Sequence, residues 1–192
     1  ARSLDPAKFQ KDAAVFEKAL AEDPTNARNR FYLAQSYRDA GNLAAALENY
    51  RLRAAMGGWE EEVYIARLNA ARLAEGLKLP QPEVVRAYLE AHNARPHRAE
   101  ALVELARYHR ERSEWPLAYL FARAALQAHP GDDLLFVEPA AHQWRAQDEC
   151  AVAAYWTGRH EEVRAICEAL LTLPELPEAE RPRILANLNF SL

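Results

Sequence analysis

The sequence predicts an all-α solenoid built from about four helix hairpins, with a single helix before them and a capping helix after them. Helix-breaking residues recur at Pro24, Gly58, Pro96, Pro130 and Pro174, at intervals of 34, 38, 34 and 44 residues. Between successive breakers, apolar residues recur with a helical period of about 3.6 in two stretches, divided by a short interruption. Each interval therefore predicts two antiparallel helices, and their recurrence predicts a repeat protein.

The predicted elements follow one another in a single domain over residues 1–192. A lone helix, four hairpins and a terminal helix are expected at about 5–22, 27–58, 62–96, 99–130, 141–174 and 178–192. Asp5-Pro6 suits the start of the first helix. Thr25 or Asn26 suits the N-cap of the next helix, and Pro82 suits a first helical turn.

The second hairpin and the terminal helix have features of their own. Asn69 and Arg72 stand in the second hairpin where small or aromatic residues are expected, and its turn is predicted to be about three residues longer. The terminal helix is predicted to cover the last hairpin, because each hairpin cannot bury its apolar face alone. Its apolar stripe is expected to consist of Ile184, Leu185, Leu188 and Leu192.

One β-like run, "LLFVE" at 134–138, lies in the longest interval and ends at Pro139. It predicts an extended loop. An apolar run must bury itself against its own repeat or against a neighbour, so the 132–140 loop is a second candidate contact surface. Asp132 and Asp133 directly precede the run and suit a turn or a helix cap.

Two alanines, Ala34 and Ala46, stand on either side of a Gly-Asn step within "FYLAQSYRDAGNLAAALENY", residues 31–50. Small side chains at these positions let two antiparallel helices approach closely, and Gly41 supplies a left-handed turn between them. A bulky residue at either alanine should overpack the hairpin and cost about 1 to 3 kcal/mol.

These positions resemble the tetratricopeptide repeat (TPR), in which a small residue, an aromatic residue and a closing breaker recur with a period of about 34 residues. The first set is Leu33, Ala34, Tyr37, Ala46, Tyr50 and Gly58. A second set is Leu105, Ala106, Ala118, Ala125 and Pro130. The resemblance spans nearly all of the chain and implies a TPR-like α-solenoid.

Three stretches also resemble TPR regions attached to bacterial and viral glycosyltransferases that use nucleotide sugars. They are residues 132–163 and the shorter phrases "FYLAQSYRDAGN" and "RAAMGGWEEEVY". The resemblance implies that a catalytic domain lies outside these 192 residues. The missing initiator Met and the ending "NLNFSL" are likewise expected of a segment cut from a longer protein.

Composition narrows the classes of partner. The net charge is −4 with both signs interspersed, which gives no positive field for a nucleic-acid backbone, so no nucleic-acid partner is expected. No apolar run reaches the length of about 18 residues that a membrane span needs, so no membrane partner is expected. Cys150 and Cys167 do not form a disulfide scaffold, and they predict a reducing, cytoplasmic setting and small core residues.

No pattern of catalysis or metal binding is present in the sequence. The six histidines include no pair three or four residues apart on one helix, so they are expected to be solvated surface residues. No Gly-rich phosphate loop, nucleophile elbow or dinucleotide fingerprint occurs, and a metal-binding Asp-x-Asp is missing. We therefore expect no catalytic residue, no metal and no cofactor in this segment.

The remaining expectation is binding in a concave groove lined by the first helix of each hairpin. Helical spacing predicts that this groove carries polar and aromatic side chains able to hold an extended peptide or a carboxylate. They are Arg28, Tyr32, Gln35, Arg38, Asp39, Arg67, Glu104, Arg107, Glu111, Arg145, Asp148 and Glu149. The alternative for each of them is a solvated helix face.

The functional hypothesis is a non-catalytic module that binds a peptide or protein partner, or docks an adjacent catalytic domain, as part of a larger glycosyltransferase. A free-standing TPR adaptor is the alternative, and a self-sufficient helical enzyme is a third, disfavoured hypothesis. The carboxylate clamp of TPR co-chaperones is not matched, because Phe31 and Gln35 stand where Lys and Asn are needed. The row of inward asparagines found in some sugar-transferring TPR enzymes is also missing.

Overall fold

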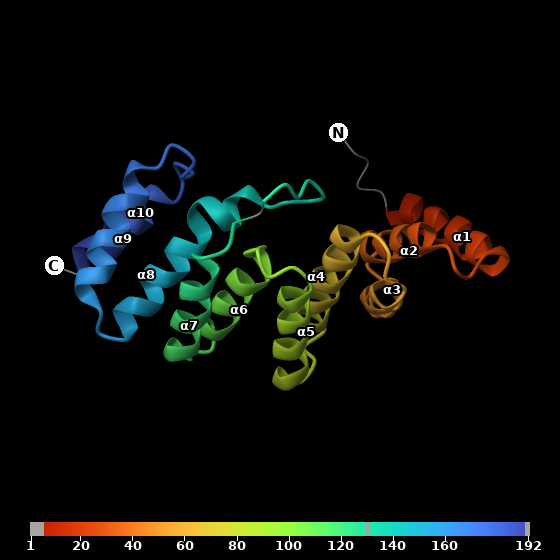
Figure 1. Ribbon diagram of the computed structural model, residues 1–192, viewed down its shortest axis with the longest axis horizontal. Helices are drawn as coiled ribbons and strands as arrows, with labels where there is room; N and C mark the ends of the chain where they lie inside the picture. The colour runs from red at the N-terminus through yellow and green to blue at the C-terminus, as the bar shows by residue number, and fades with distance from the viewer. Residues whose placement is uncertain (1–5, 130, 191–192) are drawn as a thin grey trace. The chain divides into compact units, whose positions relative to one another are not determined.

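The computed structural model describes residues 6–129 and 131–190, and these residues form helices and connecting turns with no strand (Figure 1). The all-α class predicted from the sequence is confirmed. The helices are α1 (Pro6–Glu22), α2 (Ala27–Asp39), α3 (Leu43–Ala55), α4 (Glu60–Gly76), α5 (Gln81–Ala94), α6 (Glu100–Arg110), α7 (Trp115–Ala125), α8 (Ala146–Trp156), α9 (His160–Thr172) and α10 (Arg181–Phe190). A π-helical turn, η1 (Ala141–Arg145), leads directly into α8.

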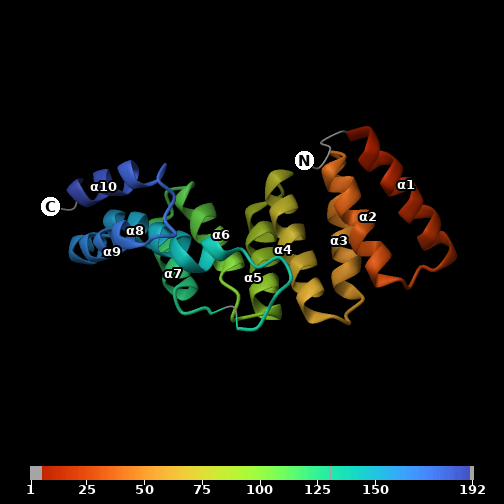
Figure 2. The same cartoon turned by 90° about the horizontal axis from the view of Figure 1, so that it is seen from above.

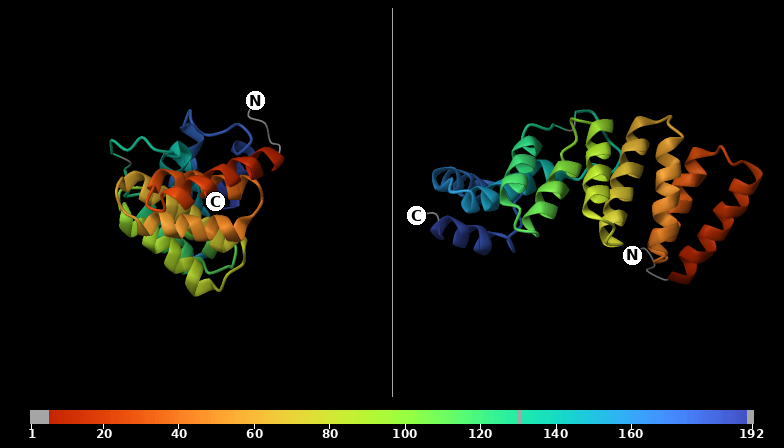
Figure 3. Two further views of the ribbon diagram at one scale, coloured as in Figure 1. Left: turned by 90° about the vertical axis from the view of Figure 1, so that its right-hand side faces the viewer. Right: turned by 90° about the horizontal axis from the view of Figure 1, so that it is seen from below.

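The helices fall into two compact units, Ala1–Arg95 and Pro96–Leu192. In the first unit each helix from α1 to α5 packs against the next one along the chain (Figure 2). In the second unit α6 packs on α7, α7 on α8, α8 on α9 and α9 on α10 (Figure 3). Sequence neighbours are therefore spatial neighbours within each unit, as in stacked hairpins. The single domain expected over 1–192 stays a prediction.

Local signals explain where several helices begin and end. The Asn26 side chain accepts a hydrogen bond from the Asn29 N–H at 3.0 Å, and Asn42 caps α3 in the same way. A residue with positive φ follows the first helix of each hairpin, namely Gly41, Lys78, Ser113 and Gly158. Only two of these are glycines, so the turn geometry recurs more regularly than the sequence does.

Small buried residues recur in register with these turns. Ala34 and Ala46 are fully buried, in agreement with the expectation that a larger side chain at either position would overpack the hairpin. Ala71, Ala106 and Ala151, at the same position counted back from the positive-φ residue, are also buried. An alanine at this point of each first helix leaves room for the second helix to approach.

The turn of the second hairpin differs from its prediction. Residues 77–80 connect α4 to α5, whereas residues 40–42 connect α2 to α3, so the second turn is one residue longer and not about three. The reason is that Gly76 still belongs to α4 and Lys78, at φ 57°, takes the left-handed position of Gly41.

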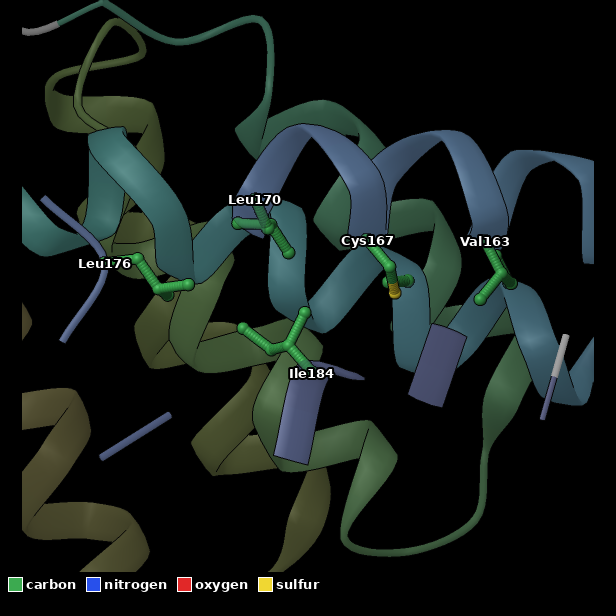
Figure 4. Packing of buried hydrophobic residues seen from close by; sticks show 7 residues of the cluster. Val163, Cys167, Leu170, Leu176 and Ile184 are labelled. Atoms are coloured by element: carbon green, nitrogen blue, oxygen red, sulfur yellow. The ribbon is translucent and has the colours of Figure 1, made fainter. Parts of the chain in front are cut away.

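The terminal helix covers the last hairpin as predicted, but with a narrower apolar stripe. Ile184 is fully buried among Val163, Cys167, Leu170 and Leu176 (Figure 4). Leu188, one turn further along, also packs against this cluster. The prediction that Leu185 belongs to this stripe is wrong. Leu185 follows Ile184 directly, so its side chain points away from the cluster, and it is 49% exposed. Leu192 lies outside the described residues.

The two cysteines occupy the core, as predicted. Cys150 and Cys167 are both buried and free. Burial raises the pKa of each thiol to about 11, because the thiolate would lose its hydration there. Neither thiol has the electropositive, exposed setting of a reactive cysteine.

A buried ionic cluster holds the loop between α7 and η1. The Arg98 and Glu100 side chains are fully buried and lie 2.6 Å apart, and Arg98 also reaches Asp133 at 3.3 Å. Arg98 donates further to the backbone carbonyls of Leu135 and Phe136. Asp133 is therefore a buried ion-pair partner, a role that the sequence analysis did not assign, and the turn or cap role expected for it stays a prediction.

Two apolar side chains of this loop are exposed, and the alternating Leu135 and Val137 are half-buried. Leu134 is 88% exposed and Phe136 is 56% exposed, so the run buries only part of its apolar surface against its own repeat. Residues 131–138 form a loop and no strand, as predicted, but the loop is not extended, because it turns at Leu135 and Phe136, where Phe136 has φ 46°.

Two histidines, His109 and His142, have buried side chains, although all six histidines were expected to be solvated surface residues. His109 is 2% exposed, bonds through Nδ1 to Glu114 and stacks on Phe121. The His142 side chain is 10% exposed and its Nε2 lies 3.5 Å from Glu100. Both are buried because a carboxylate is available to each ring, which the sequence spacing does not reveal.

Candidate functional site

A cavity of about 410 Å³ opens in the second unit, beside the faces of α6 and α8 that were expected to line the groove. Four arginines line it, and we call this surface the arginine groove. Its lining residues are Arg107, Arg110, Trp144, Arg145, Asp148, Glu149, Val152, Glu180 and Arg183. Four of these, Arg107, Arg145, Asp148 and Glu149, belong to the residues predicted from the sequence.

Helical spacing fixes the position of Arg107. Its Nε donates to Glu104 at 2.8 Å and its Nη1 donates to Glu111 at 3.0 Å. Glu104 lies three residues before Arg107 and Glu111 lies four residues after it, which are the spacings that bring side chains together on one face of a helix. The three predicted residues of α6 and its C-terminal turn are therefore joined in one ionic row.

Two ionic contacts tie the face of α6 to the helix that follows the 131–138 loop. Arg145, the last residue of η1, places Nη2 3.2 Å from Glu104. Arg110 donates from Nε to Glu149 at 2.7 Å and from Nη2 at 3.3 Å, so one edge of the guanidinium meets both oxygens of one carboxylate. The alternation of charges across α6 and α8 holds these side chains in defined positions.

A third helix contributes a residue that the sequence analysis missed. Arg183 of α10 donates to both carboxylate oxygens of Asp148, at 3.0 and 2.9 Å, and also to Glu180. The terminal helix was interpreted only as a cap, so its polar face was not assigned. Arg110 was also missed, although it lies one helical turn after Arg107 and could have been found by that spacing.

Two carboxylates that pair with the groove arginines, Glu104 and Glu149, lie deeper than those arginines, whereas Glu180 at the edge of the cavity is 34% exposed. The side chains of Glu104 and Glu149 are each 10% exposed, whereas those of Arg107, Arg145 and Arg110 are 23%, 25% and 32% exposed. Burial raises the pKa of Glu149, and the hydrogen bond from Arg110 works against that rise. A ligand entering the cavity therefore meets these guanidinium groups before it meets Glu104 or Glu149.

The residues predicted on α2 lie in the first unit. Arg28 donates to the Tyr32 hydroxyl at 3.2 Å and lies over the Tyr32 ring, and Arg38 donates to Asp39 at 2.9 Å. Gln35 is half-buried on the same helix. The structure thus places these five predicted residues along one helix.

Arg67 does not lie with the residues of α2. It lines a cavity of about 260 Å³ formed by α3, α4 and α5. Arg67 lies as many residues before Lys78 as Arg30 lies before Gly41, so these two arginines occupy equivalent positions. The position in α4 that is equivalent to Arg28 is held by the buried Ile65. The register of α4 therefore turns Arg67 to a different face from the one expected.

No metal centre or membrane span is found in the described part of the chain. Residues 6–129 and 131–190 contain no group of three or more His, Cys, Asp or Glu placed to hold a metal ion. Over the same residues, no helix combines the length and the apolar character needed to cross a bilayer.

Comparisons with known proteins agree on the fold. Residues 15–48 match the sequence model of the family described as tetratricopeptide repeat. The chain is similar to the crystal structure of MamA, with a TM-score of 0.64 and 15% identity over 96% of this chain and 91% of that chain. It is also similar to a thermophilic TPR protein in Thermus thermophilus, with a TM-score of 0.57 and 17% identity over 95% and 92% of the two chains.

A comparison with curated protein sequences finds no match. The TPR-like α-solenoid predicted from the sequence is confirmed by the helices and by these two solved structures. At such identities the likeness concerns the fold alone.

Proposed function

We propose that this TPR-like α-solenoid is a non-catalytic protein-interaction module that binds an extended segment of a protein partner in the arginine groove. One observation carries the proposal. Four guanidinium groups from α6, η1 and α10 line a single cavity, and each of them is paired with a carboxylate of the same unit. The packing of apolar helix faces does not by itself call for four arginines around one cavity.

The pairing prepares the guanidinium groups for a ligand. A guanidinium held by a carboxylate loses less side-chain entropy when it binds, so more of its hydrogen-bond energy remains for the partner. Its planar fork fits backbone carbonyls and acidic side chains. Trp144 and Val152 add apolar surface beside the charges. An extended segment that carries acidic or amide side chains has the matching chemistry.

The residues of α2 belong to the same proposal as a separate contact on the first unit. Arg28 and Tyr32 offer a guanidinium and an aromatic ring, and Arg38 and Asp39 offer both charges. Their support is the mixed charge on one helix face, which suits a polar segment better than an apolar one.

The attachment of this chain to a glycosyltransferase remains part of the proposal and is supported by the resemblance of residues 132–163. In that setting the partner is an acceptor protein or an adjacent catalytic domain, and the setting is cytoplasmic. A free-standing adaptor accounts for the same structure. The neighbouring coding sequence separates the two, since an adjoining α/β domain with Asp-x-Asp is expected only in the first.

The binding proposal is tested by selecting a phage-displayed peptide library on the full chain. Peptides that bind the wild type should lose at least about tenfold in affinity when Arg107→Ala and Arg145→Ala are combined, which corresponds to about 1.4 kcal/mol. The matched control combines Arg123→Ala with Arg164→Ala, which removes the same charge from residues that do not line the cavity.

A second variant separates binding from folding. Combining Arg107→Lys with Arg145→Lys keeps a cation beside Glu104 but removes the planar fork. Helix content measured by circular dichroism should match the wild type, while peptide affinity should still fall. Equal affinity for the wild type and both groove variants would place the binding site elsewhere.

A further inference from the structure

A second cluster of arginines lies in the first unit, where α4 packs against both α3 and α5 (Figure 2). Each helix contributes one arginine to the cavity of about 260 Å³, Arg51 from α3, Arg67 from α4 and Arg86 from α5. Small side chains leave the space between them. The remaining lining residues are Ala54, Ala55, Ala70, Glu83, Ala87 and Glu90.

These arginines differ from those of the arginine groove in their partners. Among the described residues, Arg51 and Arg67 have neither an ion pair nor a hydrogen bond. The Nε of Arg67 is fully buried and meets no acceptor. Arg86 approaches Glu90 only to 3.8 Å, and both side chains are largely exposed. The guanidinium at the centre of the cluster is therefore unsatisfied on the protein side.

A buried donor without an acceptor loses its hydration without compensation, and an ion or a water commonly accounts for such a group. A water would satisfy the hydrogen bond but would leave the charges unbalanced. Three guanidinium groups face two carboxylates, Glu83 and Glu90, in this cavity, so one positive charge remains in excess. An anion satisfies the donor and reduces the repulsion together.

The position of Arg67 within its helix does not by itself create a cluster of arginines, as a comparison with Arg30 shows. Arg30 has the same register as Arg67, and its Nε is also buried without an acceptor. However, its Nη1 donates to Asn49 at 3.0 Å. The cavity beside it contains no second arginine, being lined by Pro24, Thr25, Ala27, Leu52, Ala55, Met56, Gly57 and Gly58.

We propose that Arg51, Arg67 and Arg86 form a binding site for a phosphate group, either free or carried on a partner. A phosphate presents several acceptor oxygens and a charge of about −2, which suits donors that arrive from three helices. A planar carboxylate is matched by one guanidinium fork and leaves the other two arginines without an acceptor. The site is independent of the arginine groove, which lies in the other unit.

The first test titrates the full chain with inorganic phosphate and follows the arginine Nε–H resonances by NMR. The Arg67 resonance should shift and saturate, whereas sodium chloride at the same ionic strength should not reproduce the shift. In Arg67→Met and, separately, Arg51→Met, the affinity for phosphate should fall at least tenfold. Arg30→Met, the matched control, should bind as the wild type does.

A loss of phosphate affinity in these variants can be distinguished from a loss of folding. Arg51 is exposed, so its substitution by Met leaves the core intact, and circular dichroism checks each variant. The proposal would be overturned if the Arg67 resonance did not shift when phosphate is added. It would also be overturned if Arg67→Met and Arg51→Met both bound phosphate as tightly as the wild type does.

A second arm identifies the source of the phosphate. A phosphoserine peptide and its unmodified serine counterpart are compared with inorganic phosphate. If the phosphate is carried on a partner, the phosphopeptide should bind at least tenfold more tightly than inorganic phosphate, with the loss again confined to the Arg51 and Arg67 variants. If it is free, the two should bind alike. Binding of the unmodified peptide as tight as that of the phosphopeptide would overturn the proposal.

Discussion

Replacing Glu100 with glutamine removes one charge from the buried cluster that ties α6 to the 131–138 loop. Glu100 accepts hydrogen bonds from Arg98 at 3.0 and 2.6 Å and from the Glu138 N–H at 3.1 Å. Removing one partner from a buried ion pair costs about 3 to 5 kcal/mol. Asp133, 3.3 Å from Arg98, still balances part of its charge, so we expect a loss at the lower end, about 3 kcal/mol.

The loss should depend on pH in a definite direction. Burial by itself raises the pKa of Glu100, but hydrogen bonds from His142, Arg98 and the Glu138 N–H outweigh it and hold the pKa well below the ordinary value of 4.5. The unfolded chain therefore binds a proton at a higher pH than the folded chain does. The stabilisation is fully present above about pH 4.5 and is lost as the pH falls below that value.

Urea unfolding at pH 7 and at steps down to about pH 3 measures both effects. The free-energy difference between wild type and Glu100→Gln should be about 3 kcal/mol at pH 7 and should shrink below about pH 4.5. Glu168→Gln, the same substitution at an exposed residue of α9, should stay within about 0.5 kcal/mol of the wild type. A difference that is small at pH 7, or constant with pH, would refute the reasoning.

Three further outcomes follow from the packing. Ala34→Leu should lower the free energy of unfolding by about 1 to 3 kcal/mol, because the fully buried alanine has no room for a larger side chain; unchanged stability in urea would contradict this. Cys150 and Cys167 should resist a thiol reagent at pH 8 in the folded chain and react in urea, because burial raises the pKa of each to about 11; rapid labelling of the folded chain would show an open core. Ile184→Ala should cost about 2 to 5 kcal/mol and the exposed Leu185→Ala much less, as measured by urea unfolding, and equal costs would mean that α10 packs differently.

The fold could be predicted because its determinants are local and repeated. Breakers such as Pro24 and Gly58 mark the hairpin ends, and small residues such as Ala34 mark the close approach of two helices. Both signals lie within one repeat. The turn at Lys78 was less visible, because a non-glycine residue takes the left-handed conformation there.

The candidate site could be predicted only in part. Arg107 and Glu111 share one helix face, which helical spacing reveals. Arg67 was assigned to the wrong face, because its register depends on the position of the turn after α4. The pairing of Arg98 with Asp133 joins residues 35 positions apart, and no periodic pattern in the sequence connects them.

The most direct test of the proposed function maps a selected peptide onto the chain by NMR. Backbone amide shifts induced by the peptide should be largest in α6, α8 and α10, near Arg107, Arg145 and Arg183, and should be smaller at the same peptide concentration in the combined Arg107→Lys and Arg145→Lys variant. Shifts confined to other helices, or unchanged in that variant, would contradict binding in the arginine groove.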